Sequence, residues 1–112
     1  MRKLFVAAFL TFALSDGAGA NSKLTLTGAD IVSACTRLDP DWINFCNGYV
    51  QAVIDGMYRP GDGLCIPSST SRAKIVDVVT SRLTASSELK KLNGASAAYR
   101  ILLEAYPCSQ TR

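Results

Sequence analysis

The sequence of 112 residues contains no histidine. This absence excludes Ser-His-Asp and Cys-His nucleophile systems, zinc sites with histidine ligands and histidine pH switches. The excess of positive charge is small, with 12 Lys and Arg against 9 Asp and Glu, and it is spread along the chain. We therefore expect no nucleic-acid-binding surface. Hydrophobic residues make up 48% and charged residues 19% of the chain, a balance typical of a globular domain with a core.

Long hydrophobic runs are also scarce. The longest, residues 4–14, follows two basic residues and is interrupted only by a threonine. It is too short to cross a bilayer, which takes about 20 helical residues. The small-x-small sequence Ala-Gly-Ala at residues 18–20 is the pattern that signal peptidase cuts. We predict that residues 1–20 are a signal peptide cleaved after Ala20, and that residues 21–112 form one small exported domain that is not held in a membrane.

All the cysteines lie in the predicted mature domain, at Cys35, Cys46, Cys65 and Cys108. An even number of cysteines in a small exported domain predicts disulfides. A zinc site is the alternative, but the spacing includes no Cys-x-x-Cys pair. Three connectivities are possible for two bonds. Because Cys35 and Cys46 flank a tight turn between two predicted helices, we favour Cys35–Cys46 with Cys65–Cys108, as structural bonds rather than a redox site.

The pattern of the mature chain is helical from its start. Thr-Gly-Ala-Asp at residues 27–30 resembles a capping box and predicts a short helix that ends near Leu38. Asp39-Pro40 then predicts a second helix, with a capping residue before a proline at the first helical position. Apolar residues recur at i, i+3, i+4 and i+7 as far as Met57. This stripe assigns three aromatic residues to the core, namely Trp42, Phe45 and Tyr49, with the alternative that a tryptophan at a helix start is partly exposed at an interface.

The second half of the chain continues in the same way. The sequence Pro-Gly-Asp-Gly at residues 60–63 ends the second helix, and Thr70 is the predicted cap of a third. The β-branched residues of that segment would also suit a strand, but a lone strand would have no partner. Ser86 or Ser87 begins a short helical turn, and Asn93 begins a last helix. We predict an all-α fold, a small single-domain bundle of four to five helices stapled by two disulfides.

Gly48 lies in the middle of the second predicted helix. Glycine there costs about 1 kcal/mol relative to alanine. We expect a packing reason for it, namely the close approach of a neighbouring helix, and the alternative is a role in binding.

The loop from Tyr58 to Leu64 is the candidate recognition element. It combines an arginine, an aspartate between two glycines and a predicted disulfide just beyond its end. Loops held on rigid scaffolds often carry binding, and an ordered loop loses less entropy when it enters a partner. The alternative is that the glycines only turn the chain. The predicted partner-binding residues are Tyr58, Arg59, Asp62 and Leu64.

Catalytic groupings are hard to find. Asp39 and Asp41 lie two apart at the start of a helix, where carboxylates commonly act as caps, and no other close acidic pair falls on a helical core face. The sequence therefore predicts a protein that is not an enzyme, with no metal site and no cofactor.

Three short motifs occur in a recognisable order: Phe-Cys-Asn-Gly-Tyr at residues 45–49, Cys-Ile-Pro at 65–67 and Glu-Ala-Tyr-Pro-Cys at 104–108. Together with the cysteine positions and the export signal, they resemble the Rap/Tai family of immunity proteins over residues 28–108. The chain departs from the family pattern at two places. Ser86-Ser87 stands where proline usually precedes glutamate, and Tyr106 stands where phenylalanine is commoner.

The resemblance implies an all-helical periplasmic protein, often a homodimer, that binds a peptidoglycan amidase effector of a type VI secretion system and blocks its cleft. The alternative is a periplasmic stress or chaperone-like protein that has the same fold and no effector.

Overall fold

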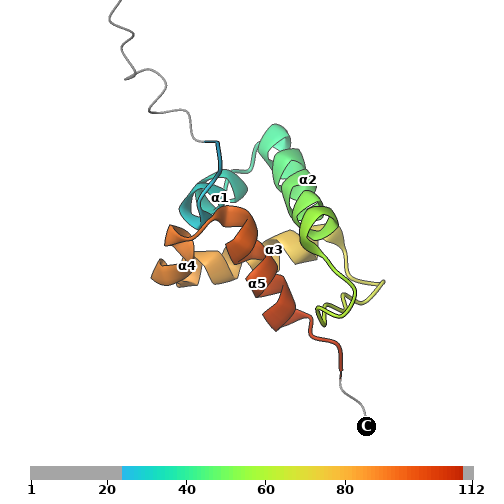
Figure 1. The fold of residues 1–112 in the computed structure, drawn as a ribbon. Coiled ribbons are helices and arrows are strands. Elements are labelled where there is room, and N and C mark those ends of the chain that lie inside the picture. The colour runs from blue at the N-terminus through green and yellow to red at the C-terminus, as the bar shows by residue number, and fades with distance from the viewer. Residues whose placement is uncertain (1–23, 110–112) are drawn as a thin grey trace, which may run out of the picture.

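The computed structural model describes residues 24–109, so the predicted signal peptide lies outside the described residues (Figure 1). The described chain forms five helices and no strand, which confirms the all-α prediction. Two isolated bridges, Thr27 with Asn93 and Leu64 with Pro107, join segments far apart in sequence. None of the described helices has the length and apolar character needed to cross a membrane. The helices are α1 (Gly28–Cys35), α2 (Pro40–Met57), α3 (Arg72–Ala85), α4 (Ser87–Lys91) and α5 (Gly94–Ala105).

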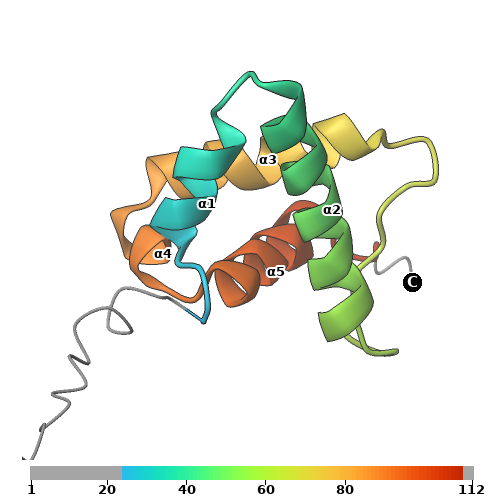
Figure 2. The same ribbon diagram turned by 90° about the horizontal axis from the view of Figure 1, so that it is seen from above.

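The core is built around α5, which contacts each of the other four helices. In Figures 1 and 2, α2 lies on one side of the bundle and α1 and α4 lie on the other. Ala97 and Ala98 of α5 are fully buried, and their small side chains let the neighbouring helices come close. Larger buried residues from four helices complete the core: Ile31, Val50, Val53, Val79, Leu83, Tyr99, Ile101 and Leu102.

Local capping signals begin most of the helices where the sequence predicts. The Thr27 hydroxyl accepts a hydrogen bond from the Asp30 amide at 3.2 Å, and the Asp30 carboxylate accepts one from the Thr27 amide at 2.9 Å, a complete capping box. The Asn93 side chain caps α5 as predicted. The cap of α3 is Ser71 and not Thr70, because the Ser71 hydroxyl accepts from the backbone amide three residues on.

The end of α1 differs from the prediction, since the helix stops at Cys35 rather than near Leu38. The Thr36 hydroxyl donates to the carbonyl oxygen of Val32 at 2.8 Å, and Thr36 is the C-cap residue. Proline at position 40 disfavours helical backbone in the residue before it. The connection to α2 is therefore longer and more exposed than the pattern indicated.

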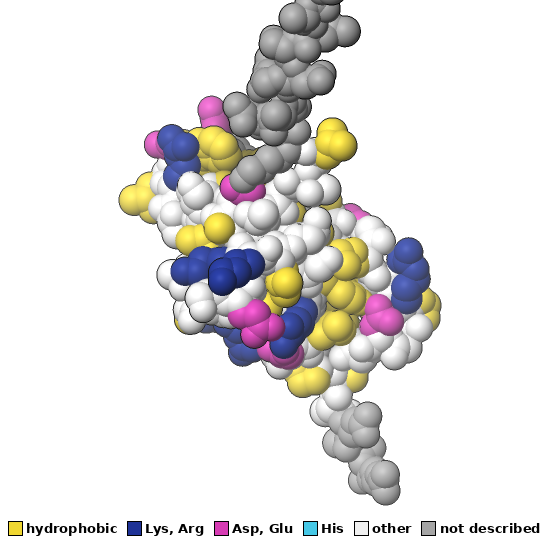
Figure 3. Space-filling model, turned by 60° about the vertical axis from the view of Figure 1, so that its left-hand side comes forward, with side chains coloured by type: hydrophobic (Ala, Val, Ile, Leu, Met, Phe, Trp, Pro, Cys, Tyr) yellow, Lys and Arg dark blue, Asp and Glu magenta, His cyan; other side chains and the backbone are white. Residues whose placement is uncertain are grey.

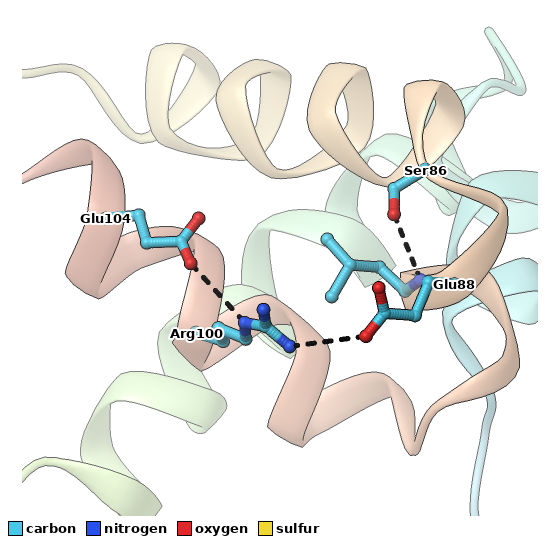
Figure 4. Close-up of polar contacts among 5 residues, drawn as sticks. Ser86, Glu88, Arg100 and Glu104 are labelled. Atoms are coloured by element: carbon cyan, nitrogen blue, oxygen red, sulfur yellow. Dashed lines mark hydrogen bonds and ion pairs between the residues drawn. The ribbon is translucent and has the colours of Figure 1, made fainter.

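The short helix α4 is held against α5 by side chains (Figure 4). Ser86 is its cap, with its hydroxyl accepting from the Leu89 amide at 3.1 Å. Arg100 of α5 pairs with Glu88 of α4 at 3.9 Å and with Glu104 on its own helix at 3.4 Å. Exposed ion pairs contribute little stability each, so these contacts add little to the packing of α4. Ser86 thus supplies the helix start.

Both predicted disulfides are confirmed. Cys35 at the end of α1 is bonded to Cys46 in α2, with a Cα–Cα distance of 5.6 Å. Cys65 is bonded to Cys108, with a Cα–Cα distance of 4.7 Å. The first bond fixes the corner between α1 and α2, and the second ties the segment after α2 to the segment after α5.

Of the aromatic residues of α2, Phe45 is not in the core, contrary to the prediction, whereas Tyr49 packs against the core as expected. Phe45 is 39% exposed, and Trp42 and Tyr49 are half-buried. At 3.6 residues per turn, the buried positions Cys46, Val50 and Val53 define the inner face of α2. Phe45 is one residue, or about 100°, away from that face.

Gly48 also corrects the sequence-based interpretation. A Cβ atom built at Gly48 would have no atom within 4 Å, and the residue is exposed. It lies two residues after Cys46, on the outer side of α2. No neighbouring helix of the described chain approaches it. The glycines that do have close neighbours are Gly28 and Gly94.

Candidate functional site

The 58–64 loop leaves the end of α2 and turns sharply. Gly61 and Gly63 have φ angles of 95° and 82°, a region in which other residues are strained. The Asp62 amide donates to the carbonyl oxygen of Arg59 at 3.1 Å and closes the turn. The glycines are therefore required by the shape of the loop.

The far end of the loop is fastened to the segment after α5. The Cys65 amide donates to the carbonyl oxygen of Tyr106 at 2.8 Å, and the Cys108 amide donates to that of Gly63 at 2.9 Å. These two bonds flank the Cys65–Cys108 disulfide. The loop is thus held by covalent and backbone contacts to the segment directly after α5, and such contacts pre-order a binding loop.

Asp62 is exposed, yet its carboxylate connects the loop to α5. Its carboxylate accepts a hydrogen bond from the Tyr99 hydroxyl at 2.5 Å and another from the Arg59 amide at 3.1 Å. Tyr99 is a core residue of α5, only 8% exposed. The hydrogen bond to Asp62, followed by burial and by the negative charge of Asp62, raises the pKa of the Tyr99 phenol above its ordinary value. Asp62 therefore links the loop to the core.

This link predicts a specific alkaline sensitivity. Because the pKa of Tyr99 is raised in the folded state, its contribution to stability is complete below about pH 10 and is lost as the pH rises through the folded-state pKa. We expect the free energy of unfolding of the native protein to exceed that of Tyr99→Phe at pH 7. The difference between these two free energies of unfolding should become smaller above about pH 10. Urea titrations of both proteins across this range measure it, and a constant difference would contradict the assignment.

The other predicted partner-binding residues have different environments. Tyr58 is 42% exposed. Arg59 is exposed, and its guanidinium donates to the carbonyl oxygens of Gly56 at 3.3 Å and Tyr58 at 2.8 Å, close to the end of α2. Leu64 is half-buried and, with Ile54, Tyr58 and Ile66, lines a shallow hollow of about 190 Å³. Tyr58, Arg59 and Asp62 are thus exposed, while Leu64 is half-buried, and Asp62 also anchors the loop.

A second exposed region, residues 37–45, was not singled out by sequence reasoning. We call it the corner surface, because it spans the turn between α1 and the start of α2. Eight of its nine residues are exposed, and the ninth, Trp42, is half-buried. Leu38 is 89% exposed and Ile43 is 45% exposed. The available signal was the position of these two residues outside the periodic stripe of α2.

Arg37 lies at the centre of the corner surface. Its guanidinium carbon is 4.8 Å from the ring centroid of Trp42, and its Nε is 3.7 Å from a carboxylate oxygen of Asp39. Asp39 occupies the N-cap position of α2 as predicted, but its side chain makes no capping hydrogen bond. It is directed to Arg37 instead, which leaves Trp42 covered on one face by a cation.

The potential for metal chemistry can be checked directly. Within residues 24–109, no group of three or more cysteine, aspartate or glutamate side chains is placed to hold a metal ion. The described cysteines are all in disulfides.

The comparison with known families gives one match. The family model described as Rap1a immunity proteins matches residues 27–108, nearly all of the described chain. Neither a curated protein nor a solved structure matches the sequence.

Proposed function

The chain belongs to the Rap1a family of immunity proteins, and from this membership we propose that it is a periplasmic protein that binds and inhibits a type VI secreted peptidoglycan amidase. The family assigns an immunity role against a secreted effector. The observation that carries the proposal is the family match over residues 27–108, which includes every helix, both disulfides and the 58–64 loop.

An exported location is supported by the disulfides. Bonds of this kind persist in oxidising compartments such as the periplasm. The predicted signal peptide over residues 1–20 is consistent with the same location. An amidase that attacks peptidoglycan acts in that compartment, so the inhibitor and its target would meet there.

The 58–64 loop is the element that we propose to enter the amidase cleft, through the exposed side chains of Tyr58 and Arg59. The Asp62–Tyr99 hydrogen bond and the Cys65–Cys108 disulfide hold the backbone of the loop in place before binding. A loop that is already ordered loses less conformational entropy in the complex. Tyrosine and arginine are also the residue types that most often dominate binding energy at interfaces. The resemblance to the family also implies a homodimer, which would have to leave this loop uncovered.

The test is calorimetric titration of the oxidised protein, residues 21–112, with the peptidoglycan amidase encoded beside its gene. Hydrolysis of peptidoglycan is followed in the same samples. We expect a tight complex in which the amidase is inactive. A protein that neither binds this amidase nor protects cells that receive it would contradict the proposed function.

Substitutions in the loop locate the inhibitory contact. Tyr58→Ala and Arg59→Ala should each raise the Kd for the amidase about tenfold or more, since each removes an anchor side chain. Arg82→Ala is the matched control, because Arg82 is also exposed but lies in α3. Thermal unfolding of each variant separates loss of binding from loss of fold. Equal affinity of the Arg59 and Arg82 variants would place the inhibitory contact elsewhere.

A further inference from the structure

We propose that the corner surface, residues 37–45, is a second docking surface for the same amidase and receives a basic, partly apolar patch of that enzyme. This inference rests on the proposed function, because it names the amidase as the partner. It concerns the opposite end of α2 from the 58–64 loop.

The first observation is the density of exposed apolar side chains. On the face shown in Figure 3, hydrophobic side chains lie in several separate groups among acidic and basic ones, as on most protein surfaces. The corner surface differs because Leu38, Ile43 and Phe45 lie within eight consecutive residues and are 89%, 45% and 39% exposed. Concentrated apolar exposure of this kind marks an interaction site.

The second observation is the shape of this region. Two hollows lie beside the corner surface, with Arg37 lining both. One, of about 420 Å³, is also lined by Trp42 and Phe45, and the other, of about 370 Å³, is also lined by Leu38 and Ile43. Hollows of this size accept large side chains of a partner, and such filled pockets are where hot-spot residues bind.

Charge identifies the partner. Arg37 is the one basic residue that lines the two hollows in the described chain, and it is paired with Asp39. Three carboxylates lie in or beside the hollows, with Asp77 lining the second and Asp39 and Asp41 in the corner surface itself. A complementary partner therefore presents apolar side chains between lysines or arginines.

A second copy of the chain fits the corner surface poorly. In a twofold dimer the same patch meets itself, so the carboxylates of one corner would face those of the other. Residues 24–57 carry four acidic residues and one basic residue, whereas residues 72–105 carry six basic and three acidic ones. Like charges in contact oppose association. A homodimer is thus expected to use a different face.

The spacing of the two surfaces suits one partner. The 12 residues 46–57 of α2 lie between the corner surface and the 58–64 loop, and at 1.5 Å per residue they span roughly 18 Å. A standard interface covers about 800 Å² on each partner, which is roughly 30 Å across. One amidase molecule is therefore wide enough to contact both ends of α2.

The single tryptophan of the chain gives a direct readout, because Trp42 belongs to the corner surface. The full mature protein, labelled with 5-fluorotryptophan, is titrated with the unlabelled amidase encoded beside the gene. We expect its one fluorine resonance to shift and to lose its sensitivity to solvent deuteration in the complex. A resonance unchanged at saturation, with amidase activity inhibited, would overturn the corner assignment and leave the proposed function intact.

Paired variants measure the energetic contribution. Leu38→Ser with Ile43→Ser should raise the Kd for the amidase about 100-fold. Asp39→Asn with Asp41→Asn should raise it about tenfold and weaken its dependence on salt. The matched controls are Leu92→Ser, which is 37% exposed in the native protein, and Glu88→Gln, both remote in sequence from the corner surface.

The two proposals fail in different ways. If the native protein binds the amidase and the corner variants bind as tightly as the controls, the corner surface is not an interface. If the native protein does not bind the amidase at all, the proposed function is wrong, and so is this inference.

Discussion

Replacing Cys65 and Cys108 together by alanine is expected to lower the free energy of unfolding by about 4 kcal/mol, the largest effect of any change considered for this chain. The disulfide joins residues 43 apart in sequence, so without it the unfolded chain gains the entropy of a long open loop. Small domains are stable by only about 5 to 15 kcal/mol in total. We therefore expect a protein that is largely unfolded at modest urea concentrations.

The matched comparison is the other disulfide. The bond between Cys35 and Cys46 joins residues 11 apart, and its loss should lower the free energy of unfolding by about 3 kcal/mol. Urea unfolding followed by circular dichroism gives both values. A smaller loss for the Cys65 and Cys108 pair than for this pair would show that strain or residual structure outweighs loop length.

Removal of each disulfide should also affect a different part of the structure. Without the Cys65–Cys108 bond, the 58–64 loop keeps only its backbone contacts and the Asp62–Tyr99 hydrogen bond. We expect faster amide exchange and faster proteolysis in that loop, with the corner surface unaffected. Loss of the Cys35–Cys46 bond should reverse this pattern, because that bond fixes the corner between α1 and α2.

Features encoded within a few neighbouring residues could be predicted from the sequence. A helix cap uses hydrogen bonds between residues three apart, so Thr27 and Asn93 were recognisable without knowledge of the fold. The pairing of Cys35 with Cys46 followed from the short turn between two helices. The all-α class followed from the period of the apolar residues.

Features that depend on how the helices are placed could not be predicted. The apolar stripe of α2 covers a wide arc, and only the positions of α1, α3 and α5 decide that Val50 and Val53 face inward while Phe45 stays exposed. The hydrogen bond between Asp62 and Tyr99 joins residues 37 apart in sequence, and no local sequence pattern predicts it. The role of Asp62 as an anchor of the loop therefore could not be read from the sequence.

Glycine substitutions test the helix placement that the sequence did not predict. Gly28→Ala should lower the free energy of unfolding by about 3 kcal/mol. The added Cβ would overlap the carbonyl oxygen of Leu89 and lie 2.9 Å from the Cα atom of Lys90, both backbone atoms of α4. Backbone atoms cannot rotate away as a flexible side chain can. The Gly28 amide also donates to the carbonyl oxygen of Leu92 at 2.9 Å, so a shift of α4 would strain that bond.

Gly48→Ala should have the opposite effect and raise the free energy of unfolding by about 1 kcal/mol. Nothing lies within 4 Å of the added Cβ, and alanine has the higher helix propensity. The two variants carry the same chemical change within the first and second helices, so the difference between them, measured by urea unfolding, reports only their surroundings. If both were stabilised, α4 could not lie against the start of α1 as described. If both were destabilised, the outer face of α2 would have to be covered, as it would be by a second copy of the chain.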